Sequence, residues 1–308
     1  MANGILKDEA TYYENSEKYS GDSGSSTNMW VIEDTYDFIT VAESQDAGRT
    51  YMRLVNDIDF NEHDIYKKGF DNKIFKPITY YYLYGDGHKI KNIVATNCSD
   101  YVFPFSYIEN VDFVNLVSIN CNGLFIIKVV GETNNCNFGV FFSDGRFYFD
   151  SGTFNDCTFN IKGKIRDGNC IIGQNVSFNR CHFNFDINSR IKTNDQSRGF
   201  FYGSGESNPS NFTNCYFTGR VKDSGTLSPY WSGEYNTMIN CYFAFEYIGI
   251  RDFSTGKATC RTCFVDKELF EKNNSTWTNQ NGIIALTTAQ AQDPEYLNSI
   301  GFAVVPIE

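Results

Sequence analysis

The 308-residue sequence predicts an all-β protein: a single-stranded right-handed parallel β-helix, or solenoid, with a short N-terminal capping helix and a C-terminal helical cap. Three observations predict this fold. Aromatic residues make up 17% of the chain, and Phe and Tyr favour strands. Asn and Gly, which favour turns, recur between the apolar runs. Short Cys-containing strands return every ~20–35 residues, a period typical of stacked repeats.

The first segment, residues 1–28, differs in composition from the rest of the chain. It is polar and contains the Gly/Ser-rich stretch "SGDSGSS", which is typical of a flexible linker. This N-terminal arm is either a disordered terminus or an attachment arm that folds on a partner. It lacks the basic start and apolar stretch of a signal peptide. We therefore expect synthesis in a reducing cytoplasm, with the cysteines kept as thiols.

Residues 29–80 predict an N-terminal cap of strand, helix and strand. A Trp-x-Ile strand comes first, and Asp34 or Thr35 then caps a helix that runs to about Gln45. The following stretch "TYMRLVNDIDFN" alternates apolar and polar residues, as a strand does. We expect the helix to cover the apolar side chains of the first coil, which would otherwise form an exposed edge.

Residues 81–266 predict the coils. A turn at Gly85-Asp86-Gly87 separates the first two strand-like runs. Later copies of a motif such as "TNCYF" place Cys and the Phe two positions on at the same face of a strand. We expect this face to point inward, the preceding Asn to pair with Asn of the neighbouring coil, and the intervening Tyr to point outward. The predicted ladder consists of Cys136, Cys157, Cys181, Cys215, Cys241, Cys263, Phe138, Phe159, Phe183, Phe217 and Phe243.

The recurring cysteines have three interpretations. Zinc sites usually show two close Cys pairs, whereas only one CxxC spacing is present, from Cys260 to Cys263. A disulfide framework is typical of small secreted scaffolds rather than of a long chain with singly spaced cysteines. A solenoid of buried thiols explains the period, the alternation and the missing partners together. We expect Cys215 and Cys241 in adjacent coils as free thiols, and no metal.

Residues 267–308 predict the C-terminal cap. Thr288 can cap a short helix, and Pro294 suits the first turn of another helix. Tyr296, Leu297 and Ile300 would lie on one side of this second helix, and Gly301 is a natural helix stop.

The net charge of −11 limits the classes of partner. An acidic surface repels phosphate backbones, so we expect no nucleic acid. No window approaches the ~18 uninterrupted apolar residues of a membrane span, so we expect no membrane insertion.

Several stretches resemble a known family. The run "MWVIEDTYDFITVAESQDAGRTYMRLVNDIDFN", then "FKPI" and "LYGDGHKIKNI", is similar to the opening of β-helical surface proteins with GLUG-type repeats. The ending "DPEYLNSIGF" resembles their terminal helix, whereas the GLUG tetrapeptide itself is absent and "NGLF" is the nearest match. Members include bacterial adhesin-like proteins and bacteriophage virion proteins. The resemblance implies a β-helix with a surface role and brings no catalytic residues.

The missing signal peptide favours the phage branch of this family. We expect a virion structural protein, such as a tail or head fibre, spike or receptor-binding subunit, located in the virion. The N-terminal arm would contact other virion proteins, and the loops that interrupt the coils would contact a host-cell receptor or glycan. A bacterial adhesin-like protein at the cell surface and a pure scaffold are the alternatives. A homo-oligomer is compatible with each.

The sequence predicts a protein that is not an enzyme and has no cofactor. Glycan hydrolysis, as in a tailspike-like depolymerase, needs two carboxylates ~5–10 Å apart. Asp57 and Asp59 share a strand face, but alternation alone produces such pairs. Other acids and histidines are scattered, and no Gly-rich phosphate loop leads from a strand into a helix. The scattered acids and histidines are Asp186, Glu246, Asp252, His63, His88 and His182.

Binding residues are predicted in a loop. "SPYWSGEY" places Tyr230, Trp231 and Tyr235 in one Gly/Ser-rich stretch. Exposed aromatic rings dominate recognition surfaces, although large rings also pack down on the wall of a solenoid. The run Tyr80 to Tyr82 has the same two interpretations, and alternation requires at least one of its rings to point outward.

Overall fold

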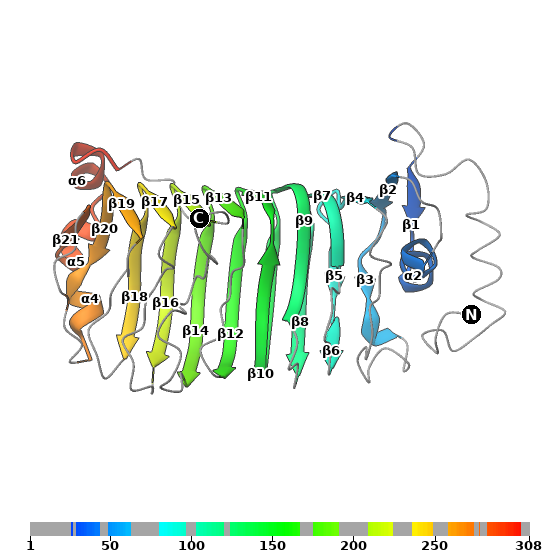
Figure 1. The fold of residues 1–308 in the computed structure, drawn as a ribbon, viewed down its shortest axis with the longest axis horizontal. Helices are drawn as coiled ribbons and strands as arrows, with labels where there is room; N and C mark the ends of the chain where they lie inside the picture. The colour runs from blue at the N-terminus through cyan, green and yellow to red at the C-terminus, as the bar shows by residue number, and fades with distance from the viewer. Residues whose placement is uncertain are drawn as a thin grey trace. The chain divides into compact units, whose positions relative to one another are not determined.

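In the computed structural model, the strands stack in parallel as successive rungs of a right-handed β-helix (Figure 1), so the predicted fold class is confirmed. The chain divides into two compact units, Met1–Asn160 and Ile161–Glu308, and each is described by itself. The described residues are 26, 29–43, 49–62, 80–96, 103–119, 124–166, 175–190, 209–223, 236–248, 258–273, 277 and 282–302.

The first unit contains two walls of parallel strands. In one wall each strand pairs with the next, in the order β1 (Trp30–Ile32), β2 (Arg49–Leu54), β4 (Tyr80–Tyr84), β7 (Phe103–Glu109) and β9 (Leu124–Asn134). Strand β9 also pairs with β10 (Asn137–Asp150) and β11 (Gly152–Asn155). The other wall contains β3 (Ile58–Asp59), β5 (Lys89–Lys91), β6 (Val94–Thr96), β8 (Asp112–Ile119) and β10. The short 3-10 helix η1 spans Phe60–Glu62, and β12 (Thr158–Arg166) contains the boundary between the units.

The second unit repeats this arrangement. One wall runs through β13 (Val176–Asn179), β15 (Asn211–Thr213), β17 (Thr237–Ile239) and β19 (Thr259–Arg261). The other runs through β14 (His182–Arg190), β16 (Tyr216–Asp223), β18 (Tyr242–Ile248), β20 (Cys263–Asp266) and β21 (Ile283–Leu286). Helices α4 (Lys267–Glu271), α5 (Thr288–Ala291) and α6 (Pro294–Ser299) follow.

The residue before each motif cysteine makes the corner between two walls. Asn214 and Asn240 have φ angles of 55° and 53°, in the left-handed region. Asn adopts this region more readily than most residues. The Asn240 amide donates to Asn214 Oδ1 at 2.6 Å, so the expected pairing between neighbouring coils is present. The same left-handed turn precedes every other motif cysteine, at Asn135, Asp156, Arg180 and Thr262.

The thiols line the interior directly after these corners. Cys215 and Cys241 lie in adjacent coils, because the Tyr242 amide donates to the Cys215 carbonyl at 2.9 Å. Each thiol also donates to a carbonyl of the preceding coil: Cys215 to Phe178 at 3.3 Å and Cys241 to Phe212 at 3.5 Å. Burial raises the pKa of the Cys241 thiol. The described cysteines, all free and buried, are Cys136, Cys157, Cys181, Cys215, Cys241, Cys260 and Cys263.

Phenylalanine rings fill the space beside the thiols. In the first unit Phe138 stacks on Phe159 at 5.1 Å. In the second unit Phe183, Phe217 and Phe243 form a continuous stack with centroid distances of 5.1 and 5.0 Å. Rings in register at the strand spacing of ~4.8 Å stack in this way, so register and packing support each other.

The N-terminal cap contains helix α2 (Thr35–Glu43). Asp34 is the residue that caps it, because its Oδ1 accepts from the Asp37 amide at 2.8 Å. Phe38 and Ile39 are fully buried, and Phe38 meets Phe60 edge to face at 5.8 Å. The expected helix end near Gln45 lies outside the described residues.

The C-terminal helices divide the capping between them. Phe270 of α4 stacks on Tyr247 at 5.1 Å and meets Phe245 at 6.0 Å, so α4 covers the interior of the last described coils. Helices α5 and α6 instead lie against the outer face of β18 and β20, where Phe264 and Leu297 share one apolar cluster. Tyr242 of the repeated tetrapeptide therefore points outward as expected but is 3% exposed.

The cap of α5 is one residue earlier than the sequence suggested. Thr287, not Thr288, accepts from the Gln290 amide at 3.2 Å, and Gln290 Oε1 accepts from the Thr287 amide at 3.0 Å. This capping box requires Gln three residues after the cap, and Thr288 has no such partner position. Pro294 begins α6 after the cap Asp293, and Gly301 ends the segment with a φ of 88°. Among the described residues, no helix has the length and apolar character needed to cross a membrane.

Candidate functional site

Four tyrosines gather on the outer side of β2, β4 and β7 in the first unit. Tyr51, Tyr82 and Tyr107 lie in register across three neighbouring strands. Their rings are stacked, with centroid distances of 4.3 Å between the first pair and 6.4 Å between the second. Tyr84 lies 5.3 Å from Tyr107 by the same measure. We name these four residues the tyrosine face.

The alternation of each strand places these rings outside. Met52, Tyr81, Leu83 and Ile108 are fully buried. Because neighbouring side chains on a strand point to opposite sides, the tyrosines next to them point away from the core. All four rings of the tyrosine face are partly exposed. Of the run Tyr80 to Tyr82, Tyr81 therefore points inward and Tyr82 outward.

Two phenol hydroxyls of this face, those of Tyr84 and Tyr107, stay protonated at neutral pH. Burial raises the pKa of Tyr84 and of Tyr107 above the ordinary tyrosine value, and the charge of Glu109 acts in the same direction. The amide of Asn134 donates to the Tyr107 hydroxyl at 3.4 Å. The face therefore offers aromatic rings together with hydroxyls that can both donate and accept hydrogen bonds.

Charged groups border the tyrosine face on one side. Arg53 and Glu109 flank Tyr84 in register on the neighbouring strands β2 and β7. Arg53 is paired with Asp86 of the following turn. Mixed charges around an aromatic centre are typical of recognition surfaces, where polar groups set orientation and rings supply contact area.

The loop that sequence analysis favoured for binding, with Tyr230, Trp231 and Tyr235, lies outside the described residues. The tyrosine face was only partly visible in the sequence. Each contributing strand has the pattern Tyr-x-polar or Tyr-x-Tyr before a turn, in "TYMR", "YYLY" and "SYIE". Aligning the coils on their turns would have brought these tyrosines into one row.

The two acidic residues considered for catalysis, Asp57 and Asp59, form hydrogen bonds and an ion pair with residues of the next coil. Asp57 accepts from the Lys89 amide at 3.0 Å and pairs with Lys91 at 2.7 Å. These contacts lower its pKa, chiefly through the hydrogen bond from Lys91. Asp59 accepts a hydrogen bond from the side-chain amide of Asn92 at 2.7 Å. Both carboxylates thus tie the first two coils together.

The remaining acids and histidines are spread over the chain. Asp186 pairs with Arg220 at 2.8 Å, and Glu246 accepts from Asn273 at 2.7 Å. His88 lies 3.5 Å from Asp57. Asp252 and His63 lie outside the described residues. Within the described part of the chain, no three His, Cys, Asp or Glu side chains are placed to hold a metal ion.

His182 is half-buried on the outer side of β14 in the second unit. Its Nε2 lies 2.7 Å from Thr218 Oγ1, and its ring meets Tyr216 edge to face at 6.3 Å. Burial lowers the pKa of His182 below its ordinary value. The imidazole is therefore largely neutral at pH 7.

Comparisons with known proteins support the fold. No family model matches the sequence. No curated protein matches it either. A solved structure described as a putative immunoglobulin A1 protease from Bacteroides ovatus matches with a TM-score of 0.50 and 16% identity, over 90% of this chain and 89% of that chain. At this identity the likeness shows the fold alone.

The comparison corrects one expectation from the sequence. We expected a protein that is not an enzyme, and that expectation is wrong: the matching structure bears the name of a protease on this same fold. The scattered acids and histidines were a poor basis for excluding catalysis, because a β-helix can bring together residues from coils that are far apart in sequence.

Proposed function

We propose that this chain is a β-helical recognition protein that binds a glycan or protein at a cell surface through the tyrosine face. The supporting observation is the row of Tyr51, Tyr82 and Tyr107 in register across three strands. Tyrosine combines a large, rigid contact area with a hydroxyl, and for this reason it is enriched where proteins recognise other molecules.

The spacing of the row favours a repetitive ligand. The ring centroids of the row are 4.3 and 6.4 Å apart, on either side of the ~4.8 Å spacing of parallel strands. In a polymer whose hydroxyls repeat at a similar distance, successive units could each make the same contact with one tyrosine of the row. A surface polysaccharide has this property, and its uncharged hydroxyls suit tyrosine hydroxyls, which can both donate and accept hydrogen bonds. Among the glycan and protein ligands proposed, a polysaccharide is therefore our first choice.

A binding screen with matched variants tests this proposal. We expect the chain to retain at least one surface polysaccharide on a glycan array. Tyr82→Ala removes the centre of the row, and we expect it to weaken retention at least about tenfold, since loss of a central aromatic contact typically costs ~2 kcal/mol or more.

Phe141→Ala is the matched control, because Phe141 is an aromatic residue of the first unit that is 46% exposed and lies in β10, outside the row. It should leave retention unchanged. Equal retention by wild type and Tyr82→Ala would refute a role for the tyrosine face.

We also propose that the protein is a bacteriophage virion component, a tail or head appendage attached through residues 1–28. The resemblance to GLUG-type surface proteins supports this proposal. Immunogold labelling of purified phage particles tests it: gold at one fixed position on the particle supports it, whereas label on bacterial envelopes alone favours an adhesin-like surface protein.

A further inference from the structure

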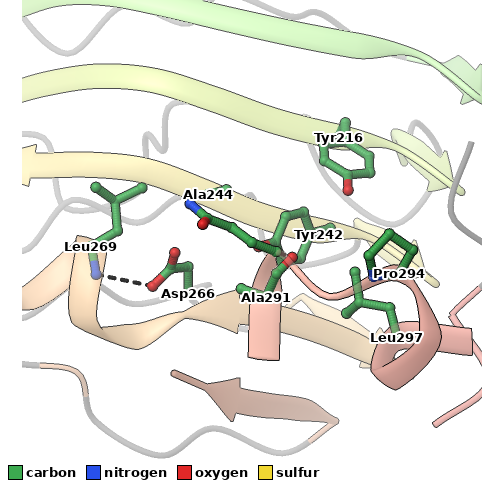
Figure 2. Close-up of a pocket in the computed structure, with 9 residues that line it drawn as sticks. Tyr216, Tyr242, Ala244, Asp266, Leu269, Ala291, Pro294 and Leu297 are labelled. Atoms are coloured by element: carbon green, nitrogen blue, oxygen red, sulfur yellow. Dashed lines mark hydrogen bonds between the residues drawn. The ribbon is translucent and has the colours of Figure 1, made fainter. Parts of the chain in front are cut away.

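A pocket of about 400 Å³ opens between the outer face of β16–β18–β20 and the helices α4, α5 and α6 of the second unit. Figure 2 shows Tyr216 and Tyr242 on its sheet side, Leu297 and Pro294 on its helical side, and Asp266 at one end. The size suits a small molecule or a single side chain. We name it the Asp266 pocket.

Asp266 is 3% exposed, and only one of its two carboxylate oxygens accepts hydrogen bonds from the described residues. Its Oδ1 accepts from the Leu269 amide at 3.0 Å and from the Thr288 hydroxyl at 2.8 Å. Its Oδ2 has no hydrogen-bond partner among the residues that the structure describes, and none of the described Lys, Arg or His side chains pairs with it. Buried carboxylates are normally paired with a cation, and no described Lys, Arg or His fills that role for Asp266.

The capping role of Asp266 does not explain its charge. Capping α4 requires one side-chain oxygen that accepts from the Leu269 amide, and Asn supplies such an oxygen about as well as Asp. A neutral acceptor can also accept the hydrogen bond from Thr288, although more weakly than a carboxylate does. A cationic ligand in the pocket would pair with this carboxylate.

The neighbouring rings suit a cation. The Tyr242 hydroxyl donates to the Ala291 carbonyl at 3.2 Å, which fixes this ring in the wall of the pocket. Burial raises the pKa of Tyr242, and the nearby charge of Asp266 raises it further. The ring of Tyr216 lies 4.8 Å from that of Tyr242, edge to face. Aromatic rings attract an ammonium group within ~6 Å of their centroids.

We propose that the Asp266 pocket binds a primary ammonium group, with Asp266 Oδ2 as its counter-ion and the ring of Tyr216 as its aromatic wall. A carboxylate ligand is disfavoured by the charge of Asp266, and a neutral alcohol would leave that charge uncompensated. The site lies in the second unit and is independent of the tyrosine face.

The test is calorimetric titration of the full chain with n-butylammonium, using n-butanol as the uncharged ligand of matched shape. We expect n-butylammonium to bind at least about tenfold more tightly, since a hydrogen bond between charged groups is stronger than one between neutral groups. Asp266→Asn keeps the cap and removes the charge, so it should abolish this preference. Equal affinity for both ligands, or an unchanged preference in Asp266→Asn, would overturn the proposal.

Two further variants keep the test decisive if Asp266→Asn fails to fold. Ala244→Leu fills the pocket and leaves Asp266 in place, so n-butylammonium should no longer bind; undiminished binding contradicts the site. Asp186→Asn removes an exposed carboxylate of the same unit that lies outside the pocket lining, and should leave binding unchanged. A loss of binding in Asp186→Asn would reveal only general attraction to an acidic surface and would also overturn the site.

The source of the ammonium group is distinguished by a second ligand. N-acetyl-lysine methylamide carries the same group on a peptide unit. Comparable binding of both ligands supports a lysine side chain of a partner protein, and binding of n-butylammonium alone supports a free amine. Tyr82→Ala should not affect either titration, so failure of this proposal and failure of the tyrosine face are separable.

Discussion

At the scale of single residues, each residue of the recurring Asn-Cys-x-Phe motif has its own structural role. Asn makes the left-handed corner, Cys fills the narrow space behind it, and Phe stacks in the core. The Cys next to the corner is small and buried, and its thiol also donates to a carbonyl of the preceding coil. This explains repeated cysteines without a metal or a disulfide among the described residues.

Replacing the corner residue tests this division. Asn240→Ala forces alanine into a left-handed conformation and removes the hydrogen bond from the Asn240 side-chain amide to Asn214. We expect the free energy of unfolding to fall by about 1–3 kcal/mol. Asn240→Gly also loses this hydrogen bond but adopts the positive φ without strain, so its free energy of unfolding should fall less. Denaturant unfolding measures both, and equal losses would contradict a conformational role.

The half-buried His182 predicts a pH dependence. Its folded-state pKa is lowered from 6.5 by burial, so the unfolded chain binds the proton more readily. Its contribution to stability is therefore complete above pH 6.5 and is lost as the pH falls from there towards the folded-state pKa.

His182→Gln cannot titrate and should reduce the loss of stability between pH 7 and pH 5. Denaturant midpoints of both proteins at each pH measure the difference, and a pH profile identical to that of the wild type would show that His182 does not contribute.

At the scale of elements, the sequence predicted those whose signals are local. The helix after Asp34, the turn at Gly85-Asp86-Gly87 and the two short C-terminal helices are present. The cap of α5 shifted to Thr287, because a capping box depends on the residue three places on. The position of α5 and α6 against an outer wall depends on contacts between distant segments, such as Phe264 with Leu297, and alternation alone does not reveal them.

Helix α4 provides a test of end capping. Phe270→Ala removes the ring that packs on Tyr247 and Phe245. We expect a loss of about 3–5 kcal/mol in the free energy of unfolding, the usual cost of deleting a buried aromatic ring. The exposed Lys267 of the same helix is the matched control, and Lys267→Ala should change stability by less than about 1 kcal/mol. A similarly small change in Phe270→Ala would mean that α4 does not seal the core.

At the scale of the whole molecule, the period of the repeat was sufficient to predict the fold class, whereas the candidate sites were not predictable in the same way. Strand alternation shows that Tyr82 or Tyr107 points outward, but the register between coils decides whether such residues form a row. Loops of unequal length separate the coils, so this register emerges from the sequence only when the coils are aligned on their turns. The Asp266 pocket was hidden for a related reason, since its walls come from β16 to α6.

The central claim is that recognition occurs on the tyrosine face. The most direct measurement is a crystal structure of the chain with a polysaccharide that it retains on the array. We predict that the glycan lies along Tyr51, Tyr82 and Tyr107, with hydrogen bonds to their hydroxyls. The claim would be contradicted if the glycan bound elsewhere, for example at the loop with Tyr230 and Trp231, while the tyrosine face contacted only solvent.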